Sequence, residues 1–187
     1  MPMSKHRPNS RIKLLLLGEG TVGKTTLKHQ FLTGTFTQNY IATLGADFAS
    51  HDFTHSSGLR VSLSIWDLAG QTSQAMLRKS FFSGARGALL LYDVTNQRSF
   101  EVLSKNWLEP LEQTLGNRPP TLLLANKVDL ANQRVIYTAD GEAYAEEMAQ
   151  KGWQTSYIET SGKEGIRVND SFDQLVSAIF SEASKEY

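Results

Sequence analysis

The sequence of 187 residues contains no cysteine. This absence excludes disulfides, thiolate metal sites, catalytic thiols and lipid groups on cysteine within this chain. The longest apolar runs, such as residues 14–17 and 88–92, are far shorter than the roughly 18 residues that span a bilayer. Neither charge is in excess, because nineteen Lys and Arg balance nineteen Asp and Glu. We therefore expect no nucleic-acid partner, no lipid anchor in this chain and a reducing, cytoplasmic location, peripheral to membranes only through partners.

Length and composition predict one domain with a hydrophobic core. Apolar residues make up 40% of the 187 residues, and roughly 100 to 200 residues are typical of one domain. The first ten residues carry Lys5 and Arg7 without an acidic residue, and the apolar core of a signal peptide is missing. We assign residues 1–10 to a flexible basic N-terminal segment and residues 11–187 to a single domain.

Apolar runs of strand length alternate with segments of helical periodicity. The runs are residues 12–17, 88–92, 121–125 and 155–159, and a helical stripe occupies residues 172–180. Runs that are apolar throughout indicate strands buried on both faces, as in parallel sheets. Residues 61–66 instead alternate apolar and polar after a turn-like segment at 55–58, which predicts an antiparallel hairpin at the sheet edge. The fold class is therefore α/β, with a mostly parallel sheet, one antiparallel edge strand and helices on both faces.

A helical pattern between residues 97 and 115 contains a proline. Trp107 and Leu111 share its apolar face, whereas Pro110 removes a backbone donor and clashes with the preceding turn. We expect a kink or a restart of the helix near Asn106, and we interpret Trp107 as ordinary core.

Residues 18–25 read Gly-Glu-Gly-Thr-Val-Gly-Lys-Thr, between a predicted strand and a helical segment. This octapeptide matches G-x-x-x-x-G-K-[ST] in the context that the motif requires. Its glycines let the loop wrap around phosphates, so that backbone N–H groups and the helix N-terminus point at the anion. Lys24 supplies a mobile positive charge, and the Thr25 hydroxyl supplies a hard oxygen ligand for Mg²⁺. The predicted nucleotide-binding residues here are Gly18, Glu19, Gly20, Thr21, Val22, Gly23, Lys24, Thr25 and Thr26.

A second motif, Asp-Leu-Ala-Gly-Gln at residues 67–71, follows the predicted edge strand. Asp67 can hold Mg²⁺ through water, the Gly70 N–H can sense a terminal phosphate, and Gln71 can orient an attacking water. Thr43, between the phosphate loop and the hairpin, offers a second hydroxyl for Mg²⁺. The predicted metal ligands are Thr25, Thr43 and Asp67.

The tetrapeptide Asn-Lys-Val-Asp at residues 126–129 ends another strand, where open α/β sheets bind ligands. The Asp129 carboxylate can accept two hydrogen bonds from the ring N–H and exocyclic amine of guanine, whereas adenine offers no matching donor pair. The Lys127 stem can cover one face of the base, and Asn126 can tie this loop to the phosphate loop. The following strand ends in a segment whose backbone N–H groups can meet the guanine carbonyl, at Ser161, Gly162 and Lys163.

These motifs, in this order, resemble the Ras superfamily of small GTPases, and the Rab family most closely, over residues 11–181. The segments that resemble Rab sequences most are residues 40–48, 66–71, 92–96 and 158–163. The resemblance implies a P-loop G domain with a six-stranded sheet. It also implies that residues 34–45 form switch I and residues 67–82 form switch II, where effectors, exchange factors and GTPase-activating proteins bind.

The resemblance assigns further roles to single residues. Phe36 is expected to cover the guanine edge, and Thr43 to reach Mg²⁺ in the GTP state. An aromatic triad is expected to meet effectors, and it consists of Phe48, Trp66 and Phe81. The alternative for this triad is packing within the hairpin and the core.

The sequence departs from the family pattern in three places. Residues 72–76 replace the usual charged and aromatic start of the switch II helix, which puts regulators shared with typical Rabs in doubt. Gly162 stands where alanine is usual, a change that a backbone contact should tolerate. The sequence ends at Tyr187 without terminal cysteines, so we expect either a truncated or an unprenylated protein.

We predict a monomeric, Mg²⁺-dependent GTPase switch in membrane-traffic-type regulation that binds GTP and GDP and hydrolyses GTP. The catalytic residues are then Lys24 for charge, Thr43 at the terminal phosphate and Gln71 for water. Ile41 occupies the neighbourhood in which heterotrimeric α subunits carry an arginine, so intrinsic turnover should be slow and activated by a partner protein.

Two alternatives remain at this point. The first is a nucleotide-bound interaction module with little or no GTP turnover, which the altered start of switch II favours and the intact Thr43 and Gln71 oppose. The second is a P-loop kinase, which leaves residues 126–129 unexplained and needs a second substrate site.

Overall fold

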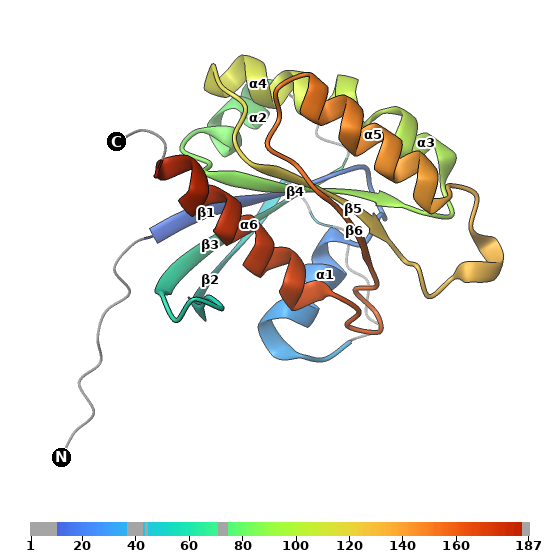
Figure 1. The fold of residues 1–187 in the computed structure, drawn as a ribbon, viewed down its shortest axis with the longest axis horizontal. Coiled ribbons are helices and arrows are strands. Elements are labelled where there is room, and N and C mark those ends of the chain that lie inside the picture. The colour runs from blue at the N-terminus through green and yellow to red at the C-terminus, as the bar shows by residue number, and fades with distance from the viewer. Residues whose placement is uncertain (1–10, 37–42, 44, 71–74, 185–187) are drawn as a thin grey trace.

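Six strands form one sheet in the order β2-β3-β1-β4-β5-β6 (Figure 1). The computed structural model describes residues 11–36, 43, 45–70 and 75–184. The predicted N-terminal segment, residues 1–10, lies outside them. The strands are β1 (Arg11–Leu17), β2 (Ala46–Thr54), β3 (Arg60–Leu68), β4 (Gly87–Asp93), β5 (Thr121–Asn126) and β6 (Tyr157–Thr160).

Helical elements follow every strand except β2, which leads directly into β3. They are α1 (Lys24–Thr33), α2 (Ala75–Phe82), α3 (Gln97–Glu101), the π-helix η1 (Ser104–Leu108), α4 (Glu109–Leu115), the 3₁₀ turn η2 (Ala131–Gln133), α5 (Thr138–Gln150) and α6 (Val168–Ala183). Strands β3, β1, β4, β5 and β6 are mutually parallel, and β2 pairs antiparallel with β3. The predicted α/β class and the single antiparallel edge strand are confirmed.

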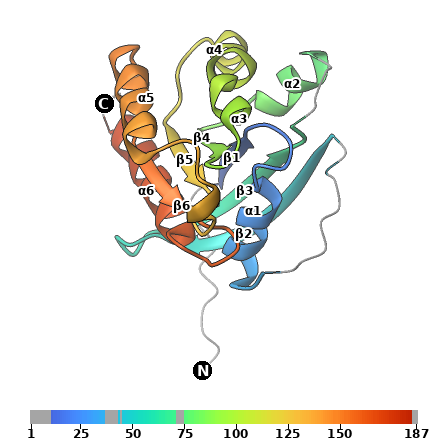
Figure 2. The same ribbon diagram turned by 90° about the vertical axis from the view of Figure 1, so that its right-hand side faces the viewer.

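Helices cover both faces of the sheet (Figures 1 and 2). On one face, α1 and α6 contribute Leu27, Phe31 and Phe172 to a buried apolar cluster. On the other face, α2, η1 and α5 contribute Phe82, Trp107 and Met148 to a second cluster. The central strands are buried on both faces because their side chains enter the two clusters alternately, and this explains their uninterrupted apolar sequences.

The hairpin differs in one respect from the sequence prediction. The edge strand is β2, whereas β3 pairs with β2 on one side and with β1 on the other. Asp67 therefore lies within β3, in an interior strand, and does not follow the edge strand as predicted. The alternation in β3 is not caused by an exposed edge: Val61, Leu63 and Ile65 are buried against α1 and α6, while the opposite face carries Ser62 and Trp66.

The segment around Pro110 does not form one regular helix. A π-helix, Ser104–Leu108, separates α3 from α4. The kink or restart of the helix expected near Asn106 is therefore present. Trp107 is fully buried, which confirms its assignment to the core. The strand predicted at 155–159 begins two residues later, at Tyr157, because pairing with β5 starts at the register Leu123–Tyr157.

Candidate nucleotide site at the carboxyl edge of the sheet

The sequence motifs meet at one edge of the sheet, because the carboxyl ends of parallel strands lie side by side. The phosphate loop follows β1, Asp67 is near the end of β3, and Asn126 ends β5. Thr160 ends β6 beside Asn126 in the β5–β6 register. Four segments that are far apart in the sequence therefore form one candidate site.

Two glycines of the phosphate loop are required by geometry. Gly18 has a φ of +138°, and a Cβ atom added there would lie 2.3 Å from the Leu91 carbonyl oxygen. Gly23 has a φ of +100°, and its added Cβ would lie 2.4 Å from Nδ2 of Asn126. Thr21 is one of three non-glycine residues with positive φ in the described chain, at 67°. The loop thus takes a backbone path that other side chains would obstruct.

Lys24 is the first residue of α1 and is buried beneath the loop. Its ammonium group donates hydrogen bonds to the carbonyl oxygens of Gly18, at 2.6 Å, and Glu19, at 2.7 Å. Burial lowers the pKa of Lys24 to about 8, and the charges of Asp67 and Glu19 oppose this shift. The loop therefore holds a cation that is poorly solvated and gains from an anionic ligand.

The N-terminus of α1 completes the phosphate-binding geometry. Its N-cap is Gly23, which has no side chain to cap the first turn. The free N–H groups of a first turn and the positive end of the helix dipole favour an anion at this position. The side chain of Val22 is buried in the core, so only its backbone is available to a ligand.

The three predicted metal ligands lie together beside Lys24. The Thr25 hydroxyl donates to Oδ2 of Asp67 at 2.5 Å and lies 3.1 Å from the Thr43 hydroxyl. Asp67 is fully buried, and its Oδ1 atom has no hydrogen-bond partner among the described residues. Hydroxyl and carboxylate oxygens are the ligands that Mg²⁺ prefers. A buried carboxylate oxygen left without a partner fits a cation that is held directly or through water.

Gly70 packs directly on the phosphate loop. An added Cβ there would lie 1.9 Å from the Gly20 nitrogen, so glycine is the residue that allows this approach. The second motif is therefore in direct contact with the phosphate loop. Gln71, the predicted water-orienting residue, lies outside the described residues.

Asn126 joins three segments of the site. Its Nδ2 atom donates to the Val22 carbonyl oxygen at 2.8 Å. Its Oδ1 atom accepts from the Thr160 hydroxyl and from the Gly162 N–H, both at 3.1 Å. The side chain is buried, so each of these bonds is shielded from water. The predicted tie between this loop and the phosphate loop is therefore present.

Lys127 and Asp129, the residues predicted to contact the base, lie in the segment after β5. Lys127 has a φ of 67°, and its ammonium group pairs with Asp93 at 2.7 Å. This pair stretches the lysine stem across the site, past Gly23. Oδ1 of Asp129 accepts a hydrogen bond from the Ser161 hydroxyl at 2.6 Å, which fixes the orientation of the carboxylate.

The segment after β6 is held against α1. Ser161 is buried, and its hydroxyl also accepts the Glu164 N–H at 3.0 Å. A Cβ atom added to Gly162 would lie 3.0 Å from the Leu27 nitrogen, a tight contact with helix α1. Lys163 is exposed and pairs with its neighbour Glu164. The absence of a side chain at Gly162 thus lets this segment approach the helix closely.

Four aromatic residues of the predicted site are on the surface or near it. Phe36 is 39% exposed after α1. The three members of the triad form a continuous row, in which the ring centroids of Phe48 and Trp66 are 5.4 Å apart and those of Trp66 and Phe81 are 6.0 Å apart. Phe48 is 49% exposed, so the row is not enclosed in the core.

Sequence reasoning missed two polar links, one beside the phosphate loop and one to it. Lys28 is buried and pairs with Asp47 and Asp67. Lys28 is four residues after Lys24, so the sequence indicates that both lie on one face of the helix. It does not indicate that two carboxylates contact Lys28. The side chain of Asn106 donates to Glu19 at 3.0 Å, so the π-helix contacts the loop. Pro110 predicts the helix distortion near Asn106, but it does not predict the hydrogen bond between Asn106 and Glu19.

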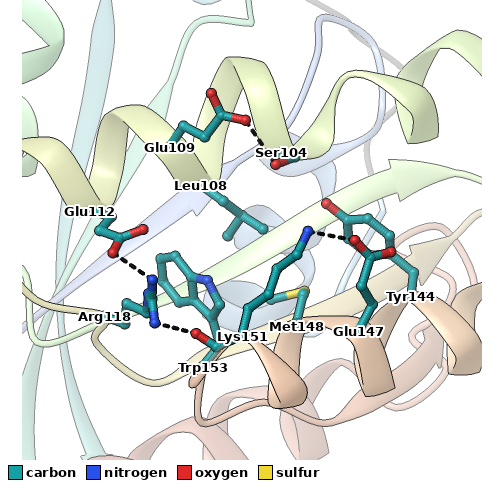
Figure 3. A pocket seen from close by; sticks show the side chains of 10 residues that line it. All are labelled: Ser104, Leu108, Glu109, Glu112, Arg118, Tyr144, Glu147, Met148, Lys151 and Trp153. Carbon is teal, nitrogen blue, oxygen red and sulfur yellow. Dashed lines mark hydrogen bonds and ion pairs between the residues drawn. The ribbon is translucent and has the colours of Figure 1, made fainter.

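A separate hollow of about 170 Å³ lies between α4 and α5 (Figure 3). Its charged side chains satisfy one another: Glu112 pairs with Arg118 at 2.8 Å, and Glu147 pairs with Lys151 at 2.5 Å. Glu109 accepts from the Ser104 hydroxyl. Both cationic side chains of this hollow, Arg118 and Lys151, are therefore already paired with glutamates.

Comparison with known proteins gives consistent matches over nearly the whole chain. The sequence model of the Ras family matches residues 13–181. Ras-related protein Rab-8B of Dictyostelium discoideum is 36% identical over 168 residues, which cover 90% of this chain and 79% of that protein. GTP-binding protein YPTM1 of Zea mays is 35% identical over 167 residues, covering 89% and 77%. Ras-related protein Rab-3B of Homo sapiens is 34% identical over 173 residues, covering 92% and 75%.

Within the described residues, no helix combines the length and the apolar character needed to cross a membrane.

Proposed function

The chain belongs to the Ras family as a Rab-like small GTPase that binds GTP and GDP, and from this premise we propose which residues bind the nucleotide and which respond to its terminal phosphate. It is a GTP hydrolase, so the reading as an interaction module without turnover is not favoured. We propose membrane-traffic-type regulation as its setting, and we assign the G domain to residues 11–187.

The phosphates are assigned to the loop after β1. Lys24 and the N–H groups of the loop and of the first turn of α1 hold the phosphate oxygens. Thr25, Thr43 and Asp67 would hold Mg²⁺, which when bound neutralises phosphate charge. Gln71 orients the attacking water, and the phosphoryl group passes to it without a covalent protein intermediate. The observation that supports this assignment is the convergence of Thr25, Thr43 and the unpartnered Asp67 oxygen beside Lys24.

Two contacts are proposed to sense the terminal phosphate. The Gly70 N–H and the Thr43 hydroxyl are both next to the phosphate loop, and each belongs to one of the two switch segments. Loss of the terminal phosphate removes a partner from both, so the two segments relax together after hydrolysis. Effectors and regulators that bind these segments then distinguish the two nucleotide states.

Guanine is assigned to Asp129, with Lys127 over one face of the ring and Phe36 at its edge. The bond from Ser161 occupies Oδ1 of Asp129 and fixes its plane. A carboxylate in this position accepts from both guanine donors, and adenine does not supply that pair.

The aromatic triad is assigned to effector binding. Basic side chains lie beside two of its members, since the hollow that Phe48 and Trp66 line is also lined by Arg11, Lys13 and Arg86. The Lys13 ammonium lies 4.3 Å from the centre of the Trp66 ring. No Asp or Glu of the described chain lines this hollow. The surface therefore suits an apolar segment flanked by acidic residues.

The test of the guanine assignment is Asp129→Asn. The amide presents an N–H group to the guanine donors, so GDP affinity should fall by about 2 to 5 kcal/mol. Xanthosine diphosphate, which has a carbonyl group in place of the exocyclic amine, should bind the variant better than GDP. Fluorescent-nucleotide competition measures both, with the exposed Asp140→Asn as the matched control. Unchanged preference for GDP over xanthosine diphosphate would contradict the assignment.

A further inference from the structure

Lys28 is a buried cation that the phosphate chemistry does not use. It lies one helical turn after Lys24 on α1 and is only 4% exposed. Its Nζ atom is 2.5 Å from Oδ2 of Asp47 and 3.6 Å from Oδ2 of Asp67. Lysine is almost never this buried unless it is paired, so its position depends on these two carboxylates.

The two carboxylates come from neighbouring strands and face each other. Asp47 of β2 is directly opposite Asp67 of β3 in the antiparallel register. Directly opposed residues lie on the same face of a sheet, and like charges there destabilise the pairing. Lys28 reaches both from α1 and offsets this repulsion. The two acids are not equivalent, because the side chain of Asp47 is 62% exposed and that of Asp67 is 1% exposed.

We propose that Lys28 is a built-in cation of the magnesium site, which holds Asp67 in place when Mg²⁺ is absent and competes electrostatically with Mg²⁺ when it is present. The inference depends on the metal site proposed above. Oδ2 of Asp67 contacts both the Thr25 hydroxyl and the Lys28 ammonium group, while its buried Oδ1 has no hydrogen-bond partner among the described residues. A fixed positive charge beside a metal-binding carboxylate lowers metal affinity and reduces the loss of order on metal removal.

The consequence concerns nucleotide retention. Because Lys28 remains in the site when Mg²⁺ is removed, the GDP dissociation rate should increase less on Mg²⁺ removal than it would without this lysine. Lys28→Met removes the charge and keeps most of the volume. In that variant, two unpaired carboxylates remain next to the phosphates in the absence of Mg²⁺, so GDP should dissociate faster. In its presence they should bind Mg²⁺ more tightly.

The experiment measures the dissociation rate of a fluorescent GDP analogue from the full chain as a function of free Mg²⁺. For Lys28→Met, the Mg²⁺ concentration that half-maximally slows release should fall about tenfold, and the ratio of the rates without and with Mg²⁺ should rise. Lys28→Arg, which keeps the charge, should behave like the unmodified protein. Lys151→Met removes a paired lysine far from the site and serves as the control.

Asp47→Asn separates this electrostatic role from a merely structural bridge between α1 and β2. If Lys28 acted only as a bridge, the loss of Asp47 would reproduce the effect of Lys28→Met. If Lys28 acts by its charge, Asp47→Asn leaves Asp67 as its one carboxylate partner of the two. The Mg²⁺ concentration that half-maximally slows GDP release should then rise. Because Asp47 is exposed, this variant should fold even if Lys28→Met does not, and circular dichroism checks both.

Equal Mg²⁺ dependence in Lys28→Met and the unmodified protein, or a shift of Asp47→Asn in the direction of Lys28→Met, would overturn the inference while leaving the metal site in place. A rate of GDP release that does not respond to Mg²⁺ in the unmodified protein would overturn both.

Discussion

Lys24 illustrates how burial prepares one side chain for an anionic ligand. Its pKa of about 8 results from desolvation, which the two nearby carboxylates only partly offset. Bound phosphates add negative charge at the ammonium group and raise its pKa again. At any pH at which Lys24 is partly deprotonated in the free protein, nucleotide binding should therefore be accompanied by proton uptake at this lysine.

This linkage predicts a pH dependence for GDP binding. At about pH 8.5 the free protein has a largely deprotonated Lys24, so binding should take up a substantial fraction of a proton; at about pH 7 uptake should approach zero. GDP affinity should accordingly weaken as the pH rises through about 8. Calorimetry in buffers of different ionisation enthalpy measures the uptake. Lys24→Arg stays protonated and should abolish it, and equal uptake in both proteins would contradict the account.

Gln71→Leu tests the residue assigned to water. Loss of the amide should slow GTP hydrolysis by roughly 10- to 100-fold through misplacement of the attacking water. GDP and GTP affinities should stay within a few fold, because the side chain acts on water and not on the nucleotide. Single-turnover phosphate release gives the rate, and Gln133→Leu at an exposed position is the control. An unchanged rate would exclude Gln71 from the positioning role.

At the residue scale, the sequence predicted groups whose role lies in a local motif. Thr25 and Asp67 were assigned from their motifs, and the structure brings them into contact. Lys28 was not found, because its two partners come from β2 and β3 and only the tertiary register places them around it. Side chains that depend on long-range pairing leave little trace in a local pattern.

At the scale of elements, Asn126 connects the end of β5 to the phosphate loop and to the segment after β6. These ties explain why three segments that follow different strands keep a common geometry. The π-helix adds another connection, because Asn106 contacts Glu19 of the loop. Elements on both sides of the loop therefore limit its movement.

Asn126→Ala should disrupt this arrangement. It leaves the buried Val22 carbonyl and Gly162 N–H without a partner, at a cost of roughly 1 to 3 kcal/mol for each unsatisfied group. Urea denaturation should show lower stability, and GDP affinity should fall together with it. Asn132→Ala, at an exposed position in η2, should change neither. Unaltered stability of Asn126→Ala would contradict the tether.

Element types were predictable where the pattern is continuous, and boundaries were not. The apolar runs of β1, β4 and β5 identify buried strands because both of their faces need apolar side chains. The alternation in residues 61–66 predicts an edge strand, but β3 is interior. A strand can pair on both sides while one of its faces stays partly polar, so alternation alone does not identify an edge. The start of β6 depends on its register with β5, which the sequence alone does not reveal.

At the scale of the whole molecule, one sheet edge combines the phosphate-loop motif with a candidate metal site and a candidate base site, while two apolar cores hold the strands in order. The strand order could not be derived from the pattern, because several orders satisfy the same sequence of strands and helices. Convergence of the motifs did follow, since parallel strands bring their carboxyl ends together in any of these orders.

The central claim is that the terminal phosphate controls two segments of this fold. Hydrogen–deuterium exchange of the Mg²⁺-loaded protein, with GDP and with a non-hydrolysable GTP analogue, tests it most directly. The account predicts stronger protection in the GTP state within residues 34–45 and 67–82, and little difference in α5, α6 and the central strands. Equal exchange of both segments in the two states would contradict the proposed switch.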